Sequence, residues 1–370
     1  MKTKAAVVYE YGKPMEIEEL DLDGPRAGEV LIRYTHAGLC HSDLHVITGD
    51  LPARLPIVAG HEGAGIVEEV GPGVTRVAPG DHVVCSFIPN CGTCRYCATG
   101  RQSICDMGAS ILDGFLPGPR FALTGARGEY GGMCMLGTFS QYGVIHQNSA
   151  VKVDDDLPLG KAVLVGCGVP TGWGSAVNTA NVSPRDTVAV YGVGGIGINA
   201  VQGARYAGAK YVVAIDPVEI KRAKALELGA THAFATAEEA QALITERTRG
   251  QGADSAIVTV GVVDADVVTA AFNVTGKDGV TVITGLSGLF TPTIQLPGAM
   301  LTLFRKTVKG SLFGDCNPTT DIPKILGLYQ SGDLKLDEII TRTYTLDQVN
   351  EGYDDLVNGK NVRGVIIHEH

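Results

Sequence analysis

The feature that most constrains the fold is a glycine-rich turn near the middle of the chain. The residues TVAVY at 187–191 are mostly apolar and β-branched, GVGGIG follows at 192–197, and the next stretch has helical spacing. A strand, a tight turn and a helix in this order are typical of a doubly wound sheet. Further strand-like segments alternate with helical ones, at 211–216, 256–261 and 280–285. We therefore predict an α/β fold with a parallel sheet over residues 169–312.

The turn itself has the spacing of a dinucleotide-binding site. Gly192 permits the tight turn, Gly194 lets the backbone approach a pyrophosphate, and Gly197 lets the helix pack closely on the strand. Gly195 completes the turn. Asp216 ends the next strand, where a carboxylate would accept hydrogen bonds from the ribose hydroxyls and repel a 2′-phosphate. The expected cofactor is NAD rather than NADP.

The residues before 169 have a different pattern, rich in short strands and turns. Strand-like runs at 29–34, 64–70 and 81–87 are separated by Gly and Pro signals. They predict a β-rich, barrel-like domain formed by residues 1–168 together with 313–370. Residues 106–136 show little periodicity, and a connection this long often carries function.

Four cysteines, Cys91, Cys94, Cys97 and Cys105, lie in one short segment. Their spacing matches tetrahedral thiolate ligation of zinc, with each sulfur about 2.3 Å from the metal. Such a site is closed to substrate, so we predict a structural zinc in a lobe at about 90–106. The alternatives are four unrelated thiols, a redox pair or an iron–sulfur cluster.

Composition excludes several classes of function. The formal net charge of the 370-residue chain is −10, which disfavours a nucleic-acid or anionic-membrane surface. No apolar run approaches the ~20 residues that span a bilayer. The first residues lack the apolar stretch of a signal peptide, so we expect a cytoplasmic protein with reduced thiols.

Three further residues could hold a second metal. Cys40 lies in GLCHSDLH, His61 in AGHEGAG and Cys167 in VGCGVPTGWG. Two cysteines and one histidine leave the fourth position of zinc open, as in alcohol dehydrogenases. Each residue alone is weak evidence, because a lone Cys or His beside glycine is more often structural.

The order of the motifs provides the missing evidence. GLCHSDLH, AGHEGAGIVEEVG, CGTCRYC, LGTFSQY, VGCGVPTGWGSA and GVGGIG follow one another along the chain. Together they resemble the zinc-dependent medium-chain alcohol dehydrogenases over nearly the whole length. The resemblance implies a GroES-like catalytic domain, a Rossmann NAD-binding domain and an active site in the cleft between them.

By this resemblance, Cys40, His61 and Cys167 match the catalytic zinc ligands. Glu62 matches an acidic residue that can approach the metal, and Asp43 matches the carboxylate that orients the ligand histidine. The resemblance thus implies two zinc ions per subunit, one catalytic and one structural.

Ser42 and His45 match a proton relay. In that relay the hydroxyl takes the proton of the alcohol, and the imidazole receives it through the cofactor ribose and releases it to solvent. Zinc favours loss of this proton, as it lowers the pKa of bound water from ~15.7 to ~7. The alternatives are a helix cap for Ser42 and a surface imidazole for His45.

The resemblance also implies contacts with cofactor and substrate. Residues matching cofactor contacts, beyond the glycine turn and Asp216, are His41, Thr171, Ile196, Lys221, Phe313 and Arg363. Residues matching the substrate pocket are Leu51, Phe87, Met135 and Trp173. Their apolar side chains suit a primary alcohol or aldehyde with an apolar or aromatic tail. Trp173 could equally be an ordinary core residue, and Lys221 an exposed helix charge.

One branch of the family matches best. The segments at 85–109, 167–180, 215–234 and 309–329 are similar to the NDMA-dependent (nicotinoprotein) alcohol dehydrogenases of actinobacteria. This branch is understood to keep NAD(H) bound through turnover and to pass electrons to an external acceptor, with mycofactocin the proposed candidate. A homodimer or homotetramer is implied. The alternatives are a dehydrogenase with freely exchanging NAD and a non-catalytic zinc protein that kept the fold.

Overall fold

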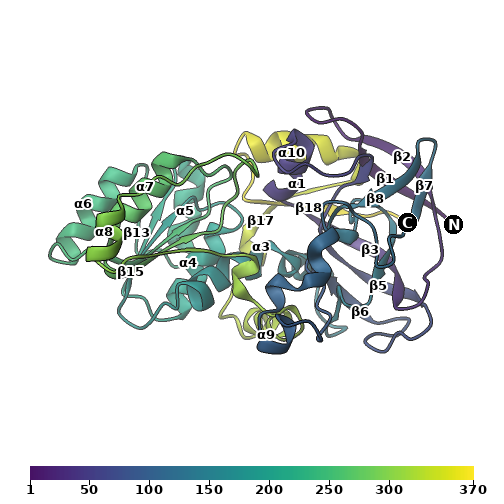
Figure 1. Cartoon of the computed structure of the whole chain (residues 1–370), viewed down its shortest axis with the longest axis horizontal. Coiled ribbons are helices and arrows are strands. Elements are labelled where there is room, and N and C mark those ends of the chain that lie inside the picture. Colours follow the sequence, from purple (N-terminus) through teal and green to yellow (C-terminus); the bar gives the residue numbers. More distant parts are fainter. The chain divides into compact units, whose positions relative to one another are not determined.

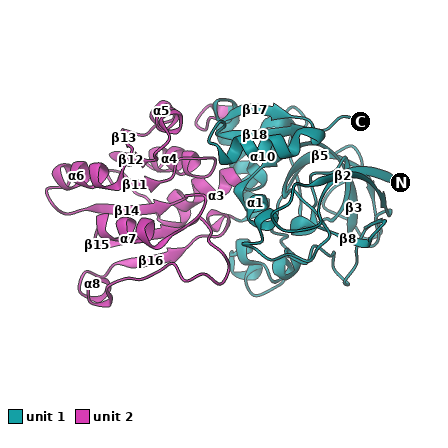
Figure 2. Ribbon diagram, turned by 90° about the horizontal axis from the view of Figure 1, so that it is seen from above, with its two compact units in different colours: residues 1–167, 317–330, 336–370 teal, residues 168–316, 331–335 magenta.

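The computed structural model describes residues 1–370, which form two compact units. The first unit contains residues 1–167, 317–330 and 336–370, and the second contains 168–316 and 331–335 (Figure 2). The sequence-based division placed its boundaries at 168/169 and 312/313, whereas the two units divide at 167/168 and 316/317. Residues 331–335 belong to the second unit, although the sequence-based division assigned all of residues 313–370 to the first.

The first unit contains a small closed barrel. Strand β1 pairs antiparallel with β2 and β4, and β8 closes the ring by pairing parallel with β4. Its interior is apolar, with Val7, Leu20 and Val58 almost fully buried. The barrel strands are β1 (Lys2–Val8), β2 (Glu16–Leu22), β7 (Leu123–Gly125), β8 (Gly128–Gly132) and β4 (Ile57–Val58).

A larger sheet follows the barrel in the same unit. Its central strand β3 pairs with β5, β9 and β18, so the last strand of the chain lies beside one of the first (Figure 1). The strands of this sheet are β10 (Ala150–Lys152), β6 (His82–Cys85), β5 (Glu62–Val70), β3 (Glu29–Leu39), β18 (Arg363–Ile367), β17 (Ile340–Tyr344) and β9 (Tyr142–His146). The helices of the unit are α1 (His41–Thr48), α2 (Leu159–Ala162), α9 (Pro318–Ser331) and α10 (Val349–Val357).

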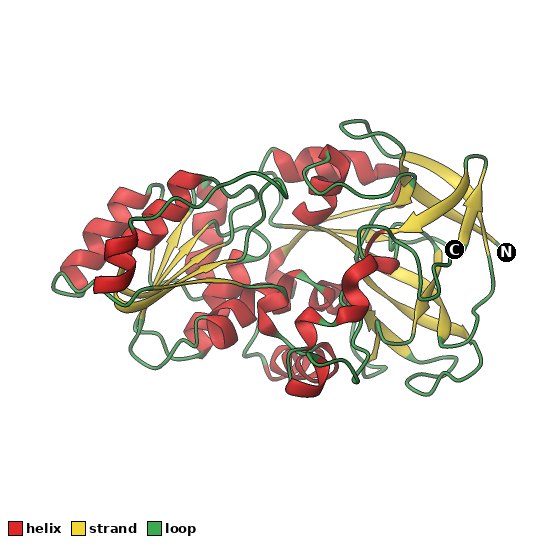
Figure 3. Ribbon diagram, in the orientation of Figure 1, coloured by secondary structure: helices red, strands yellow, loops and turns green.

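The second unit has the predicted parallel sheet. All its strand pairs are parallel, and helices lie on both faces (Figure 3). The strand order is β13 (His232–Phe234), β12 (Tyr211–Ile215), β11 (Thr187–Tyr191), β14 (Ala253–Val258), β15 (Thr275–Ile283) and β16 (Thr307–Gly310). The helices are α3 (Gly168–Gly174), α4 (Gly197–Tyr206), α5 (Glu219–Glu227), α6 (Ala237–Arg247), α7 (Ala265–Val274) and α8 (Gly298–Leu303).

Burial explains why these strands read as continuous apolar runs. All five residues of β11 are buried, because a central parallel strand is covered on both faces. The α/β fold with a parallel sheet is therefore confirmed. The two edge strands β13 and β16 were not predicted; both are short, and no residue of either is fully buried.

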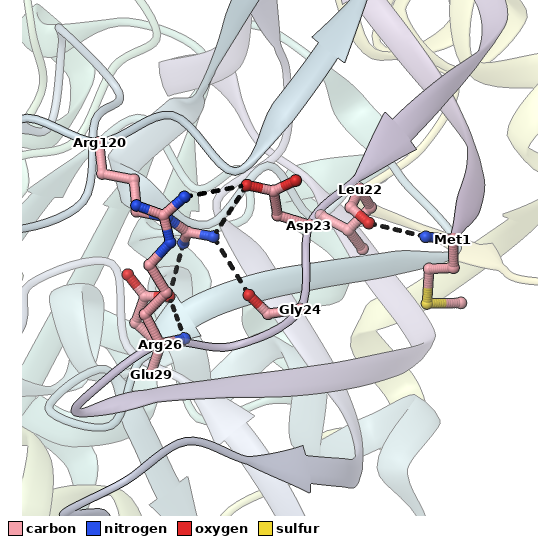
Figure 4. A network of polar contacts seen from close by, with 7 residues as sticks. All are labelled: Met1, Leu22, Asp23, Gly24, Arg26, Glu29 and Arg120. Atoms are coloured by element: carbon pink, nitrogen blue, oxygen red, sulfur yellow. Dashed lines mark hydrogen bonds and ion pairs between the residues drawn. The ribbon is translucent and has the colours of Figure 1, made fainter.

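Residues 106–136, which the sequence left unassigned, complete the barrel. They supply strands β7 and β8 and are anchored by Arg120 (Figure 4). Arg120 Nη1 donates to Glu29 Oε2 at 2.5 Å, and Nη2 donates to Gly24 O at 3.1 Å and lies 3.3 Å from Asp23 Oδ2. Arg120 and Glu29 are both buried, so this pair ties the segment to β3.

None of the helices is both long enough and apolar enough to cross a membrane.

Candidate metal centres and nucleotide-binding turn

Sheet register brings the first group of candidate ligands together. Strands β3 and β5 are antiparallel with Gly38 opposite Glu62, so Cys40, just after β3, lies near His61, just before β5. Cys167 joins them from the segment that follows α2. The ligand atoms of Cys40, His61, Glu62 and Cys167 all lie within 4.8 Å of one another, and all four residues are buried.

The orientation of His61 fits a metal ligand. Its Nδ1 lies 2.9 Å from Oδ1 of Asp43, and both side chains are buried. That contact places the ring proton on Nδ1. In the neutral ring Nε2 then carries a lone pair, and this nitrogen is buried with no hydrogen-bond partner. Buried polar atoms are nearly always bonded, so an orphaned Nε2 beside two cysteines fits a zinc site.

The pKa values of the Cys40 and Cys167 thiols are shifted in opposite directions, so Cys40 ionises more readily than Cys167. A hydrogen bond from Cys167 is the largest cause that holds the pKa of the Cys40 thiol well below its usual value. The same hydrogen bond, followed by burial, raises the pKa of Cys167. Burial lowers the pKa of His61, but the nearby Asp43 and Cys167 outweigh it and raise the value. Metal binding would displace the remaining protons, since thiolate and neutral imidazole are the ligating forms.

Glu62 does not stand alone in this cluster. It forms an ion pair with the buried guanidinium of Arg363 on β18. Gly38 leaves the space for this pair, because a Cβ there would overlap the Glu62 carboxylate and lie 3.0 Å from Arg363 Nη2. The sequence resemblance assigned Arg363 to the cofactor and did not anticipate its contact with Glu62.

The expected relay residues lie on one face of α1. Ser42 and His45 are three positions apart, and Ser42 Oγ lies 3.7 Å from Cys40 Sγ. His45 Nδ1 lies 3.2 Å from Oδ2 of the partly exposed Asp50. The N-cap of α1 is Cys40, so Ser42 is not a helix cap. His41, expected to contact the cofactor, is the half-buried first residue of this helix.

The expected pocket residues of the first unit have different surroundings. The ring of Phe87 meets the His61 ring edge-on at 5.9 Å. Leu51 donates its backbone N–H to His45 O at 2.9 Å. Met135 belongs to the apolar cluster of the barrel and has a left-handed backbone, with φ of 61°.

The four-cysteine loop is drawn into a closed knot. Cys91 and Cys97 sulfurs lie 4.0 Å apart, as do those of Cys94 and Cys105, and all nine cysteines are free. A tetrahedron with bonds of about 2.3 Å has sulfurs about 3.8 Å apart. Backbone N–H groups point at three of the sulfurs, those of Cys91, Cys94 and Cys105. Burial raises the pKa of Cys91, but hydrogen bonds from Cys94 and Thr93 outweigh it and lower the value to about 6. This donor set fits zinc.

The glycine-rich turn has the backbone that the pattern predicted. Gly192 is left-handed, with φ of +82°, and a Cβ there would lie 2.9 Å from the Val260 backbone. A Cβ at Gly197 would overlap the Gly192 carbonyl oxygen. The surroundings of Gly194 are open, since the nearest atom to a Cβ would be Lys221 Nζ at 3.9 Å. An open side at Gly194 fits the close approach of a pyrophosphate.

Asp216 and Lys221 both face this turn. Asp216 is buried and accepts hydrogen bonds from the backbone N–H groups of Val193, at 3.0 Å, and Val218, at 2.9 Å. Its carboxylate holds the turn and keeps lone pairs for a further donor. Thr259, which sequence reasoning missed, donates to Gly192 O at 2.6 Å. Thr259 directly follows β14, at the same edge of the sheet as the turn. Its position just after a strand-like segment is the sequence signal that could have identified it.

The remaining predicted residues of the second unit lie on α3, at the start of α4 and beyond β16. Thr171 is buried on α3 and accepts from Ser175 Oγ at 2.6 Å. Ile196 is the N-cap of α4. Phe313 is buried with φ of 57°. The Trp173 ring is buried and lies 6.0 Å from that of Tyr206.

Comparison with known proteins agrees with these arrangements. Residues 26–155 match the model of the alcohol dehydrogenase GroES-like domain, and residues 195–331 match that of zinc-binding dehydrogenases. The chain is 65% identical over 368 residues to the NDMA-dependent alcohol dehydrogenase of Amycolatopsis methanolica, covering 100% of this chain and 99% of that protein.

Solved structures give the same result. An alcohol dehydrogenase zinc-binding domain protein from Burkholderia ambifaria aligns with a TM-score of 0.93 at 35% identity. Benzyl alcohol dehydrogenase from Acinetobacter calcoaceticus aligns with a TM-score of 0.92 at 30% identity. Both alignments cover 100% of each chain. The protein belongs to the zinc-dependent, medium-chain alcohol dehydrogenases and is an oxidoreductase of that family.

Proposed function

We propose that the protein oxidises primary alcohols to aldehydes, or catalyses the reverse reaction, with an NAD that stays bound through turnover. An external acceptor would then reoxidise the cofactor. The observation that carries the zinc chemistry is the buried cluster of Cys40, His61 and Cys167 with the unpartnered Nε2 of His61. Retention of NAD is supported by the 65% identity to an enzyme described as NDMA-dependent.

The metal site defines what the chain does to the alcohol. Cys40, His61 and Cys167 would hold the catalytic zinc, which supplies a Lewis acid that lowers the pKa of the alcohol. Asp43 keeps the proton of His61 on Nδ1, so that Nε2 remains a ligand. Phe87 packs against the His61 ring and excludes water from that side. The four-cysteine loop would hold the second, structural zinc.

The proton of the alcohol needs an exit. Ser42 lies close to Cys40 and would accept the proton at its hydroxyl. His45 lies one helical turn further on, beside a carboxylate, Asp50, that is partly in solvent. His45 would receive the proton there and pass it to water beside Asp50.

The nucleotide site would use the turn of the second unit. NAD, when bound, accepts a hydride from the carbon of the alcohol. The open backbone at Gly194 and the amino terminus of α4 would face the pyrophosphate, and Lys221 would add a positive charge. The remaining lone pairs of Asp216 would accept from the ribose hydroxyls and disfavour NADP.

A homodimer or homotetramer is part of the proposal. Strand β16 ends the parallel sheet and has no strand on its outer side. The segment before it exposes large apolar side chains, Leu289, Phe290, Ile294 and Leu303, of which Phe290 is 87% exposed. An unpaired edge beside exposed apolar residues favours pairing with a second copy.

A single measurement tests the retention of NAD. Purified protein is desalted, no cofactor is added, and nicotinamide fluorescence is recorded before and after a simple primary alcohol is supplied. We expect the fluorescence to rise once, to about one reduced nicotinamide per subunit, and to fall when NDMA is added. Cys40→Ser protein is the control and should give no rise. No signal until NAD is added, followed by steady accumulation of NADH, would show an enzyme with exchanging cofactor instead.

A further inference from the structure

Two buried polar atoms beside the metal cluster have no hydrogen-bond partner. One is Oδ2 of Asp43 and the other is the hydroxyl of Tyr353. Asp43 is 0% exposed and Tyr353 is 5% exposed, so water does not replace the missing partners. An unpaired buried acceptor and an unpaired buried donor each destabilise a folded chain.

The other oxygen of Asp43 is fully used. Oδ1 accepts from the Gly60 backbone N–H at 3.1 Å and lies 2.9 Å from Nδ1 of His61. Both contacts act on the same oxygen, which leaves Oδ2 as the free acceptor of the carboxylate. A carboxylate held at one oxygen can rotate about its own axis, and any such rotation would move His61.

Tyr353 approaches this carboxylate from α10. Its ring packs against Phe139, with centroids 6.2 Å apart, and its hydroxyl lies within interaction range of the Asp43 carboxylate. Burial raises the pKa of Tyr353 well above its usual value, and the charges of Asp43 and Cys40 raise it further. The hydroxyl therefore lies close enough to Asp43 for the carboxylate charge to act on it. A phenol donates and a carboxylate accepts, so the two unpaired atoms are chemically complementary.

We infer that Tyr353 is a positioning residue of the catalytic metal site, which donates a hydrogen bond to Oδ2 of Asp43. The resulting chain runs from Tyr353 through Asp43 to Nδ1 of His61 and leaves Nε2 facing the metal. The inference deepens the proposed function and rests on its catalytic zinc. Tyr353 would contact neither substrate nor cofactor and would act only through Asp43.

The effect of Tyr353 should appear in metal retention. Removing a group that directly supports a ligand histidine typically weakens metal binding by 10–100-fold. Tyr353 stands one contact further away, so we expect zinc to leave roughly 3–10-fold faster in Tyr353→Phe protein. This substitution removes a single oxygen, keeps the ring against Phe139, and should leave the fold intact.

The experiment follows the release of zinc from the purified holoprotein to a coloured chelator. The four-cysteine zinc serves as an internal reference in every sample. Tyr344→Phe is the matched control, because its hydroxyl also donates to a carboxylate of α10, Asp355, at 3.0 Å. We expect Tyr353→Phe to accelerate the loss of one zinc only, and Tyr344→Phe to change neither. Thermal unfolding of both variants checks that the fold is retained.

A double-mutant cycle with Asp43→Asn separates positioning from a general structural effect. If Tyr353 acts through Asp43, Tyr353→Phe should have no further effect on zinc release in the Asp43→Asn background. Unchanged release in Tyr353→Phe, equal acceleration of both zinc ions, or the same acceleration in both backgrounds would each overturn the inference. The zinc content of the wild type, measured first, distinguishes this failure from another: a chain without a zinc that depends on Cys40 would overturn the proposed function itself.

Discussion

The Glu62 carboxylate and the Arg363 guanidinium form an ion pair in which both groups are buried. The two residues are separated by 301 positions in the sequence. A buried carboxylate needs a compensating charge, and Arg363 supplies it beside the three candidate metal ligands. The Nε of Arg363 is buried and has no hydrogen-bond partner within the chain.

Substitution of one cysteine in each proposed metal site should affect different properties of the protein, turnover in one case and stability in the other. Cys40→Ser should abolish turnover, lower the zinc content by one ion per chain and leave the thermal midpoint nearly unchanged. Cys94→Ser should lower the zinc content equally but destabilise the protein, because the closed knot depends on its metal for folding. Zinc analysis, activity and thermal unfolding are compared on the same preparations. Near-normal turnover in Cys40→Ser would show that the catalytic zinc is wrongly assigned.

Alanine substitutions at two glycines of the nucleotide turn should have different effects, one on NAD binding and the other on stability. An alanine at Gly194 has open space in the protein but would meet a bound pyrophosphate. We expect a folded protein whose affinity for NAD is weaker by about 1–3 kcal/mol, roughly 5-fold to 150-fold. Gly197→Ala should instead lower the thermal midpoint without any nucleotide, because its Cβ overlaps the Gly192 carbonyl. Calorimetric titration of NAD-free protein with NAD measures the affinity, and thermal scans measure the stability. Equal loss of stability in both variants would contradict the prediction.

The Arg120–Glu29 pair predicts a specific stability loss. Arg120→Met leaves Glu29 buried without its charge partner, which typically destabilises by about 3–5 kcal/mol. The double substitution Arg120→Met with Glu29→Gln should recover part of this loss. Urea unfolding followed by tyrosine fluorescence measures both, with the exposed pair Arg305–Asp278 as control, where Arg305→Met should cost under about 1 kcal/mol. A wild-type midpoint for Arg120→Met would show that the pair does not hold residues 106–136.

His368 predicts how stability changes with pH. Burial lowers its pKa to about 4, from 6.5 for an ordinary histidine. Between these values the unfolded chain binds a proton that the folded chain does not, so stability falls as the pH drops from 6.5 to 4. The full effect of this residue is about 3 kcal/mol. His368→Gln keeps a donor near Thr138 O and should show a smaller drop in urea midpoint between pH 7 and pH 4.5. Identical drops in both proteins would rule out this residue as the cause.

The features that were predictable from sequence are the local ones. The run TVAVY followed by GVGGIG specifies a strand, a left-handed turn and a helix through contacts within a few residues. The four cysteines likewise lie in one loop, where spacing alone limits the ligands. The parallel sheet follows from alternation of strand and helix patterns, which needs no knowledge of distant contacts.

The features that were missed depend on contacts between distant segments. Thr259 and Tyr353 have ordinary positions in the sequence. Only the fold brings Thr259 to the Gly192 carbonyl and places Tyr353 of α10 near Asp43. Strands β7 and β8 are three and five residues long and contain glycine, so they show no period-2 alternation. Arg363 could be matched to a family position, yet its pairing with Glu62 required the register of β18 against β3.

The return of the chain to its first unit has a consequence for biosynthesis. Strand β18 and Arg363 leave the ribosome only after the whole second unit has been made. Until then the central strand β3 lacks one neighbour and Glu62 lacks its counter-charge. The surroundings of the candidate metal site at Cys40, His61 and Cys167 are consequently complete only in a chain translated through residue 363, whereas the four cysteines of residues 91–105 are together while synthesis is still in progress.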